Sequence, residues 1–522
     1  MLNEALDPAI EKRIQTWLDG PFDPETKAQI RKLQLSDPKA LSDAFFKDLS
    51  FGTGGMRGLM GIGTNRMNRY TIGAATQGLA NYLKNQPKPE KGYSVFIGYD
   101  MRHHSREFAE ETARVLSGNG IAVLLSKELC PTPLVSFACR HFGCSAAVMI
   151  TASHNPPQYN GYKVYWNDGC QIVPPHDVGI MEEVAKIKDP GQIRMGATFQ
   201  EVGPELDTAY LSELKKLQLH PELTDISLKI IYTNLHGTGL RIIPKALKEW
   251  GCKQISIVEK QRSFDGNFPF APSPNPEEEK ALQLGTEQLL AEKGDLLIAT
   301  DPDADRMGVV ALDGLKPFRL TGNQIGCLCL HHICTSLEAR REFPPNAAFI
   351  KTIVTTELFR QIAESFGGKC IDVLTGFKYI GEQIGLWEKT FDAYQFLFGA
   401  EESYGYLFGT FVRDKDAISA SCLIAEVASL AKKQNLTLVD RLYQIYRNYG
   451  VHRESLTNLK FTDSQAGMEQ MESVMHRLRN NPPSQIGGQK VMHLEDYLAG
   501  SSKDFKTGKT TELLLPQSDV LR

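Results

Sequence analysis

The sequence lacks an excess of positive charge and a long hydrophobic run, and each absence excludes a class of protein. Lysine and arginine number 58 against 62 aspartate and glutamate residues, a net charge of -4, so no overall basic field exists to hold a nucleic acid. The most apolar stretches, 325–333 and 418–431, contain polar residues and fall short of the roughly 18 residues that a spanning helix needs. We therefore expect neither nucleic acid nor membrane among the partners of this chain.

A pairing pattern of cysteines is also missing, since only Cys327 and Cys329 are closely spaced. Ten cysteines are scattered along the chain without a CxxC pair, which excludes a disulfide framework and a zinc-ligand pattern. The amino terminus carries acidic residues early and matches neither a secretory signal nor a typical transit peptide. These features predict a cytoplasmic location, and nothing in the sequence indicates an oligomeric state.

What is present is the composition of a folded globular protein with several domains. The chain has 522 residues, of which 42% are hydrophobic and 23% charged, and at roughly 150 residues per domain this length predicts three or four domains. A helical opening extends to about residue 48, and a glycine-rich segment at 51–66 is predicted to have no regular structure.

Alternating strand and helix patterns then occur three times. In the first set, strands are predicted at 93–99, 121–125 and 145–150 with helices at 106–116 and 134–141. The alternation recurs within 228–300 and 347–398, and helices at 417–433 and 438–449 lead into a differently patterned end. We predict three consecutive similar α/β domains with mixed, mostly parallel sheets, plus an incomplete C-terminal α+β domain. The predicted boundaries are 1–205, 206–315, 316–450 and 451–522.

The first candidate site follows the predicted strand at 145–150, because open α/β sheets place ligand groups at the carboxyl ends of their strands. The segment reads TASHNP at 151–156, and Lys163 follows ten residues after Ser153. A serine beside an imidazole, here His154, suits a nucleophile or a carrier of a phosphoryl group. The alternative is a turn in which Ser153 and Asn155 bond only to the backbone.

The second candidate site is DPDADR at 301–306, again directly after a predicted strand. Asp301, Asp303 and Asp305 stand on one side of an extended segment, and a slight curl aims all three at one point. Three carboxylates suit a hard divalent cation and leave positions on Mg²⁺ for water and a phosphate oxygen. The alternative is an acidic solvated turn, in which three close like charges repel each other.

The third site, AEESYG at 400–405, is a weaker signal. Its adjacent carboxylates accept hydrogen bonds, which suits the hydroxyl groups of a sugar, whereas the alternative is a turn or a helix start. The glycine-rich segment at 51–66 fits no nucleotide-binding motif, but Arg57 within it is a candidate phosphate donor because glycines let a ligand approach the backbone.

Together these segments resemble the α-D-phosphohexomutases, the phosphoglucomutase and phosphomannomutase superfamily. The resemblance spans about residues 50–415 and rests on six motifs in the expected order: FGTGGMRG at 51–58, TASHNP at 151–156, NLHGTG at 234–239, FAPSPNPEE at 270–278, DPDADR at 301–306 and AEESYGY at 400–406. The first and last of these look like the long bacterial phosphoglucomutases and their phosphopentomutase and glucose-1,6-bisphosphate synthase relatives.

The resemblance implies a four-domain enzyme, an intramolecular phosphotransferase that works through a phosphorylated Ser153 and a bisphosphorylated sugar. The implied metal ligands of Mg²⁺ are Ser153, Asp301, Asp303 and Asp305. The other implied roles are Arg57, His154 and Lys163 in catalysis, Arg306 beside the phosphate, Glu401 and Ser403 on sugar hydroxyls, and Thr375, Gly376 and Lys378 in choosing the sugar orientation. In chain order, the four domains would carry the phosphoserine, the metal, the sugar and the non-reacting phosphate.

The implied reaction interconverts glucose 1-phosphate and glucose 6-phosphate, with a sugar monophosphate as the partner. Two alternatives stay open: a phosphopentomutase or glucose-1,6-bisphosphate synthase, and a weakly active sugar-phosphate-binding remnant. The second arises because the family's phosphate-holding loop, of the form RPSGTEP, does not occur in this sequence. We expect the end of the chain to form a truncated fourth domain with an unpaired sheet edge and weakened substrate binding.

Overall fold

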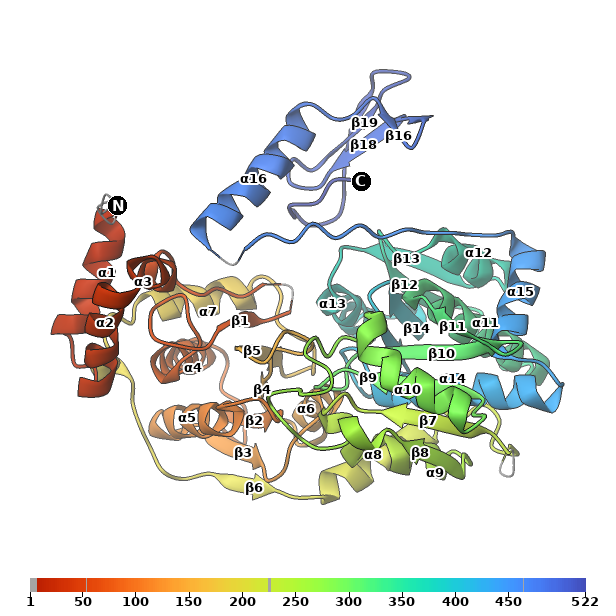
Figure 1. The fold of residues 1–522 in the computed structure, drawn as a ribbon, viewed down its shortest axis with the longest axis horizontal. Helices are drawn as coiled ribbons and strands as arrows, with labels where there is room; N and C mark the ends of the chain where they lie inside the picture. The colour runs from red at the N-terminus through yellow and green to blue at the C-terminus, as the bar shows by residue number, and fades with distance from the viewer. Residues whose placement is uncertain (1–6, 53, 224–226, 463) are drawn as a thin grey trace. The chain divides into compact units, whose positions relative to one another are not determined.

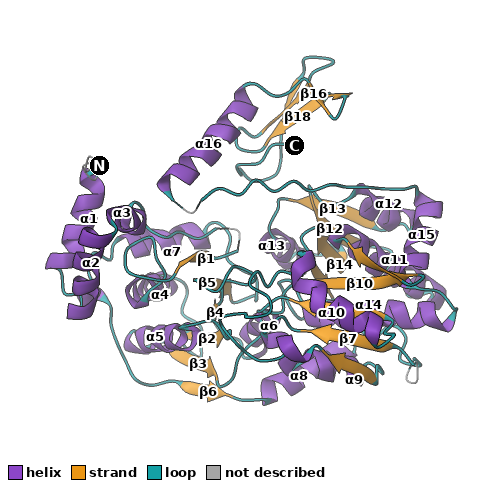
Figure 2. Ribbon diagram, viewed as in Figure 1, coloured by secondary structure: helices purple, strands orange, loops and turns teal. Residues whose placement is uncertain are grey.

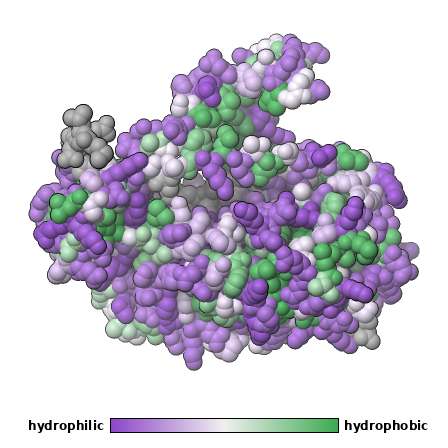
Figure 3. Space-filling model, in the orientation of Figure 1, coloured by the Kyte–Doolittle hydropathy of each residue, from purple (hydrophilic) through white to green (hydrophobic). Residues whose placement is uncertain are grey.

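The computed structural model describes residues 7–52, 54–223, 227–462 and 464–522. By its contacts the chain divides into two compact units, Met1–His452 and Arg453–Arg522 (Figure 1). Across the described ranges, no helix combines the length and the hydrophobicity that crossing a membrane requires. Over the first unit, mainly hydrophilic residues cover the face in view (Figure 3).

Three helices open the chain, and each begins at an Asp-Pro pair. They are α1 (Pro8–Asp19), α2 (Pro24–Ser36) and α3 (Pro38–Phe45). The aspartate before each proline accepts a backbone N–H of the first turn, and proline suits the first helical position because its missing N–H is not needed there. Trp17 stacks on Phe22 with ring centroids 4.3 Å apart, in a small hydrophobic core of their own.

Asp23 anchors this helical opening to the first α/β domain. Its carboxylate accepts hydrogen bonds from the backbone and the hydroxyl of Thr26 at 2.8 and 2.9 Å, and also from the hydroxyl of Tyr70. Burial alone would raise the pKa of Asp23, but the hydrogen bonds from Tyr70 and Thr26 lower it to about 2.

Replacing Asp23 with alanine should destabilise the helical opening by about 1–2 kcal/mol, because the helix loses its N-cap. Since the pKa is lowered from 3.8 to about 2, this stabilisation is complete above the ordinary pKa and is lost as the pH falls through 2. Hydrogen exchange of the α2 amides measures the effect, with the exposed Asp19→Ala as the control. Equal protection in both variants would contradict the anchoring role.

The first sheet has six strands in the order β1-β5-β4-β2-β3-β6. Its strands are β1 (Met56–Leu59), β2 (Ser94–Tyr99), β3 (Ala122–Ser126), β4 (Ala146–Ile150), β5 (Tyr159–Trp166) and β6 (Gln200–Val202). Its helices are α4 (Arg69–Lys84), α5 (Ser105–Gly118), α6 (Thr132–His141) and α7 (His176–Ala185), and α8 (Glu205–Lys215) follows. Strands β2, β3, β4 and β6 are parallel, whereas β5 runs antiparallel to β4 and β1 antiparallel to β5.

One sequence-based prediction in this region is wrong. The glycine-rich segment was predicted to lack regular structure, yet Met56–Leu59 form β1; Thr53, in the same segment, lies outside the described residues. Lys163, ten residues after Ser153, lies within β5, a strand that was not predicted from the sequence. Strand β1 is held at the edge of the sheet by its antiparallel pairing with β5, in which Arg57 lies opposite Gly161.

The second sheet has the order β11-β10-β9-β7-β8. Its elements are the strands β7 (Lys229–Thr233), β8 (Gln254–Ile257), β9 (Leu296–Thr300), β10 (Met307–Asp313) and β11 (Lys316–Leu320) and the helices α9 (Ile243–Glu249) and α10 (Glu279–Ala291). Short 3-10 helices occur at Pro190–Gln192, Thr238–Arg241 and Glu259–Gln261. Strands β10 and β11 form a hairpin and both belong to this sheet. The predicted boundary after residue 315 falls within the turn of that hairpin.

The third sheet has the order β13-β12-β14-β15. Its strands are β12 (Ala347–Thr352), β13 (Lys369–Val373), β14 (Gln395–Glu401) and β15 (Gly405–Phe408). The helices of this region are α11 (Gly322–Arg340), α12 (Glu357–Ser365), α13 (Phe377–Glu388), α14 (Ala417–Lys433) and α15 (Leu438–Tyr449). Figure 2 shows purple helices around the orange strands of the sheets.

All three sheets share one plan. Each contains parallel strands, and one of these pairs with an antiparallel strand that comes next in the chain: β4 with β5, β9 with β10, and β14 with β15. The prediction of three consecutive similar α/β domains with mixed sheets is therefore confirmed.

The second unit is small and combines one helix with short strands. Its elements are α16 (Gln465–Asn480), β16 (Gln485–Ile486), β17 (Gln489–Lys490), β18 (His493–Asp496), β19 (Ser501–Asp504) and β20 (Thr510–Glu512). The last three form an antiparallel sheet, and Arg479 of the helix bonds to Asp496 of this sheet at 3.0 Å. An α+β composition was expected here; that the domain is incomplete stays a prediction.

Candidate active site

Ser153 occupies the turn between β4 and β5. Its backbone has a φ of 51°, in the left-handed region that non-glycine residues rarely adopt, and its side chain is buried. The hydroxyl Oγ donates to Oδ2 of Asp301 at 2.7 Å and lies 3.2 Å from Nδ1 of His154. A strained backbone at a strand end thus presents the hydroxyl to a residue 148 positions away.

A buried ion pair after β2 holds this turn in place. Arg102 donates to the carbonyl oxygen of Ser153 at 2.6 Å and lies 3.3 Å from the carboxylate of Asp100. Asp100 in turn accepts from the hydroxyls of Thr151 and Ser105 at 2.6 and 2.7 Å. Because all of these groups are buried and bonded to one another, the position of Ser153 is fixed by the neighbouring strand end.

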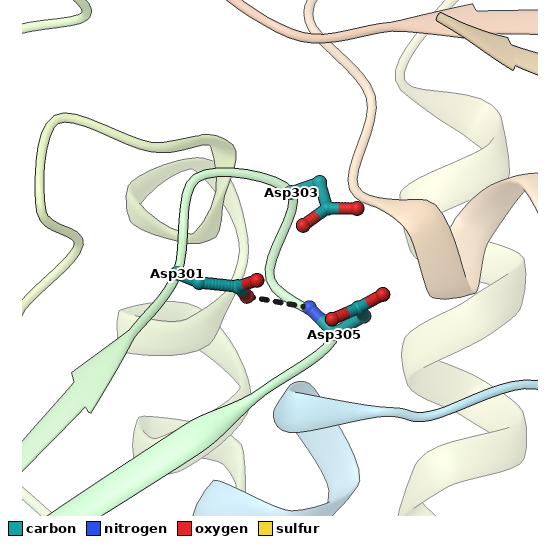
Figure 4. A group of neighbouring side chains, drawn as sticks. All are labelled: Asp301, Asp303 and Asp305. Carbon is teal, nitrogen blue, oxygen red and sulfur yellow. Dashed lines mark hydrogen bonds between the residues drawn. The ribbon is translucent and has the colours of Figure 1, made fainter. Parts of the chain in front are cut away.

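The aspartate loop joins the antiparallel strands β9 and β10 (Figure 4). Ala304 within it has a φ of 54°, which curls the loop. Oδ1 of Asp301 accepts the backbone N–H groups of Asp305 and Arg306 at 3.1 and 3.0 Å. One oxygen from each of Asp301, Asp303 and Asp305 lies within 4.8 Å of the others, so the predicted convergence of the three carboxylates is present.

The oxygens of this loop fit a metal ion. Oδ1 of Asp303 and Oδ1 of Asp305 are buried and have no hydrogen-bond partner among the described residues, which is costly for charged oxygens unless something else binds them. Burial, followed by repulsion from Asp303 and Asp305, raises the pKa of Asp301 well above its ordinary value. A hard divalent cation satisfies both conditions, because it takes oxygen ligands and offsets their negative charge.

Two lysines already face the same carboxylates. Nζ of Lys163 donates to Oδ2 of Asp303 and of Asp305 at 2.8 and 3.0 Å, and Nζ of Lys415 lies 3.3 Å from Oδ2 of Asp305. Burial would raise the pKa of Asp305, but Lys163 and Lys415 lower it below its ordinary value. Burial would likewise lower the pKa of Lys163, but Asp303 and Asp305 raise it, so this lysine stays charged.

Arginine side chains complete a cationic surrounding. Arg57 donates to Oδ1 of Asn155 at 3.0 Å and to the carbonyl oxygen of Gly54 at 3.1 Å. Arg306 donates to Glu277 at 2.7 Å. Burial and then the charges of Arg306 and Arg57 lower the pKa of His154 well below its ordinary value, so its imidazole is neutral at pH 7.

The third loop joins β14 and β15 beside the aspartate loop. The backbone of Arg306 pairs with that of Gly405, and the backbone N–H of Met307 donates to the carbonyl oxygen of Tyr404 at 3.1 Å. Oε1 of Glu401 accepts the backbone N–H of Gly376 at 2.9 Å, which connects the segment of Thr375, Gly376 and Lys378 to the same place. Burial raises the pKa of Glu401.

Not every predicted residue has the same surroundings. Nζ of Lys378 lies 3.7 Å from the carboxylate of Asp177 on α7. Ser403 is half-buried in the turn after Glu401, and Thr375 is half-buried after β13. The structure thus brings Arg57, Ser153, His154, Lys163, Arg306 and the three aspartates into one cluster, with Glu401 beside it.

Three family models match the chain in order. They describe domains I, II and III of phosphoglucomutase/phosphomannomutase and match residues 48–190, 208–314 and 321–448. The chain belongs to the phosphoglucomutase/phosphomannomutase family. It is an enzyme, a phosphoglucomutase-like intramolecular phosphotransferase.

Individual members of the family agree with this assignment. A phosphoglucomutase of Staphylococcus haemolyticus is 38% identical over 487 residues, covering 92% of this chain and 86% of that protein. One of Staphylococcus aureus strain MRSA252 is 36% identical over 490 residues, with the same coverage of 92% and 86%. Among solved structures, a putative phosphomannomutase from Thermus thermophilus shares the fold with a TM-score of 0.66 at 24% identity, covering 80% of this chain and 89% of that one. Parafusin, a phosphoglucomutase from Paramecium, has a TM-score of 0.63 at 18% identity, covering 89% and 85%.

Sequence reasoning missed several residues of this phosphoglucomutase/phosphomannomutase site. Asp100 and Arg102 directly follow a buried strand, so the rule that drew attention to Ser153 also applied to them. Thr132, whose hydroxyl donates to Oδ2 of Asp303 at 2.7 Å, begins α6 and carries no such signal. Lys415 lies in a loop after β15, and only the folded structure brings it to Asp305.

Proposed function

We propose that this chain is a Mg²⁺-dependent phosphohexomutase that interconverts glucose 1-phosphate and glucose 6-phosphate with Ser153 as the phosphoryl carrier. The observation that carries the proposal is the 2.7 Å hydrogen bond from Ser153 to Asp301, a member of the aspartate cluster. Phosphoglucomutases at 36% and 38% identity over 92% of the chain support glucose phosphates as substrates.

The residues of the chain suit a transfer between two hydroxyls. In the first half, the bond from phosphorus to Oγ of Ser153 breaks while a bond to a sugar hydroxyl forms, which gives a bisphosphorylated sugar. The hydroxyl proton needs an acceptor; His154 is neutral and its Nδ1 is 3.2 Å from Oγ, whereas Lys163 is charged and cannot accept it. In the second half, the sugar's other phosphate returns to Ser153.

The metal and the cations act on charge. Asp301, Asp303, Asp305 and phosphorylated Ser153 would hold Mg²⁺, which when bound offsets negative charge on the phosphoryl oxygens. Arg57, Lys163 and Arg306 lie around the same point and attract the phosphates of the sugar. Positioning and electrostatics therefore supply most of the rate.

Recognition of the sugar falls to the loop of Glu401 and Ser403. A buried carboxylate next to a hydroxyl accepts and donates hydrogen bonds, as vicinal sugar hydroxyls require. The bond from Gly376 to Glu401 supports a shared role for Thr375, Gly376 and Lys378 in choosing which end of the sugar faces Ser153.

The remaining predictions belong to the same proposal. The four domains would carry the phosphoserine, the metal, the sugar and the non-reacting phosphate in chain order. The partner would be a sugar monophosphate, with a bisphosphorylated sugar as activator and intermediate. The cytoplasmic location stays a prediction and rests on the scattered spacing of the ten cysteines, without a CxxC pair.

Turnover of three substrates tests the proposal. With Mg²⁺ and a catalytic amount of glucose 1,6-bisphosphate, glucose 1-phosphate should react faster than mannose 1-phosphate and ribose 1-phosphate. A preference for ribose 1-phosphate would instead identify a phosphopentomutase. Net accumulation of the bisphosphate after addition of an acyl phosphate as the phosphoryl donor would identify a synthase. Phosphorylation without turnover of any substrate would support the weakly active remnant.

A further inference from the structure

A second group of polar side chains lines a cavity of about 290 Å³ among α11, α14 and α15. Its walls include His331, His332 and Ser336 from α11, Arg441 from α15, and His220 from the segment after α8. None of these residues belongs to the proposed active site. The cavity volume is at the lower end of the roughly 300–1,000 Å³ of ligand pockets, which restricts it to a small molecule.

Arg441 is the cation of this cavity. Its guanidinium donates to Oε1 of Gln444 at 3.0 Å and to Oε1 of Gln434, both neutral amides. Burial lowers its pKa and no carboxylate offsets that effect. The neighbouring Asp440 is engaged elsewhere, since it accepts the backbone N–H and the hydroxyl of Thr437 at 2.8 Å each. Two of the five guanidinium N–H donors are thus used, and the partners are uncharged.

Glu426 is the buried carboxylate nearest to the histidines, and both of its oxygens are occupied. Oε1 bonds to Nε2 of His332 at 2.9 Å, and Oε2 accepts the backbone N–H of His220 at 3.0 Å. The ring of His220 bonds to Ser336 at 2.9 Å and to the exposed Glu222 at 2.8 Å. These contacts leave Arg441 as the group of the cavity whose charge has no counterpart.

His331 adds a further polar group. Its ring contacts Phe366 and Tyr449 edge-on, and within the described part of the chain it makes no hydrogen bond. Burial, followed by the charge of Arg441, lowers its pKa to about 4, so the ring is neutral at pH 7 and can donate one N–H.

We propose that this cavity binds a small oxyanion, a phosphate or a carboxylate, between Arg441 and His331. A planar guanidinium with spare donors matches the geometry of both groups, and the bond is charge-assisted in a half-buried place where screening by water is reduced. The ligand class follows from the uncompensated cation, and the cavity volume limits the rest of the molecule to a few atoms.

Histidine side-chain NMR of the full-length protein tests the proposal with two probes, inorganic phosphate and malonate. The His331 signal is assigned by its loss in His331→Gln. Saturable movement of this signal with either probe, but not with sodium chloride at equal ionic strength, is the expected result. Arg441→Gln should weaken the binding by at least about tenfold, since a charge-assisted bond is lost. The matched control Arg447→Gln removes an exposed arginine from the same helix and should change nothing.

The two probes separate the possible ligands. Binding of phosphate alone assigns a phosphorylated ligand, and binding of malonate alone assigns a carboxylate. Either outcome supports the oxyanion site. Phosphate bound near Ser153 does not interfere, because His331 reports only on its own cavity. An unmoved His331 signal with both probes, or equal binding in wild type and Arg441→Gln, would overturn the proposal. Arg441→Lys, which keeps the charge, should retain part of the binding and serves if the glutamine variant does not fold.

Discussion

Replacing Ser153 with alanine should abolish phosphorylation of the enzyme and lower mutase turnover by about four orders of magnitude or more. Removal of a covalent nucleophile has effects of this size because the remaining groups have no phosphoryl group to transfer. The change is small in structural terms, since the alanine methyl group lacks only the hydroxyl that donates to Asp301 at 2.7 Å. Folding should therefore be little affected.

Intact mass spectrometry provides the measurement. Wild-type protein incubated with glucose 1,6-bisphosphate should gain one phosphoryl group and lose it again with excess glucose 6-phosphate, whereas Ser153→Ala should gain none. Ser126→Ala is the matched control, because this buried serine stands at the end of the parallel strand β3 and its hydroxyl donates to the carbonyl oxygen of Glu128, away from the aspartate cluster. Full turnover by Ser153→Ala would refute the assigned nucleophile.

Replacing Asp303 with asparagine should raise the Mg²⁺ concentration needed for half-maximal activity by about 100-fold or more. Lys163 and Thr132 both donate to Oδ2 of Asp303, so the amide oxygen of asparagine would take that place. The amide NH₂ would then replace Oδ1, the oxygen without a partner. A hydrogen-bond donor would then point at the proposed cation in place of a negative oxygen. The loss of metal affinity should exceed the about 10–100-fold that follows when a group bonded to a metal ligand is replaced.

A Mg²⁺ titration of activity measures this effect on turnover. A Mn²⁺ titration monitored by electron paramagnetic resonance measures the effect on metal binding alone. Asp313→Asn serves as the control, because Asp313 ends the same strand β10 at the opposite end from the aspartate loop. Identical titrations of Asp303→Asn and wild type would show that the aspartate loop does not bind the metal.

The sequence predicts much of this fold because hydrophobic periodicity is local. The helices predicted at 417–433 and 438–449 have the observed bounds, since each has a strong pattern and a polar N-cap, Asp416 and Thr437. Strand β1 was not predicted because its partner β5 lies about a hundred residues further along the chain and because glycine obscures its own pattern. Strand β5, which pairs with both β1 and β4, was not predicted either.

The same distinction applies to the site. Ser153 and the aspartate loop are recognisable because each directly follows a buried strand, and parallel strands of open α/β sheets gather such residues at one edge. Lys415 and Thr132 come from other elements and reach the aspartates only through tertiary packing. The lowered pKa of His154 depends first on its burial and then on Arg306, 152 positions further on, so no local pattern could reveal it.

The division of the chain after His452 has a consequence for how the enzyme can change over generations. Every residue proposed for the phosphoryl transfer, from Arg57 to Arg306, precedes that division. The first unit thus contains all residues proposed for the transfer step, so a change confined to the second unit does not replace any of them. Alterations after residue 452 would therefore leave in place the residues proposed to make and break the phosphoryl bond.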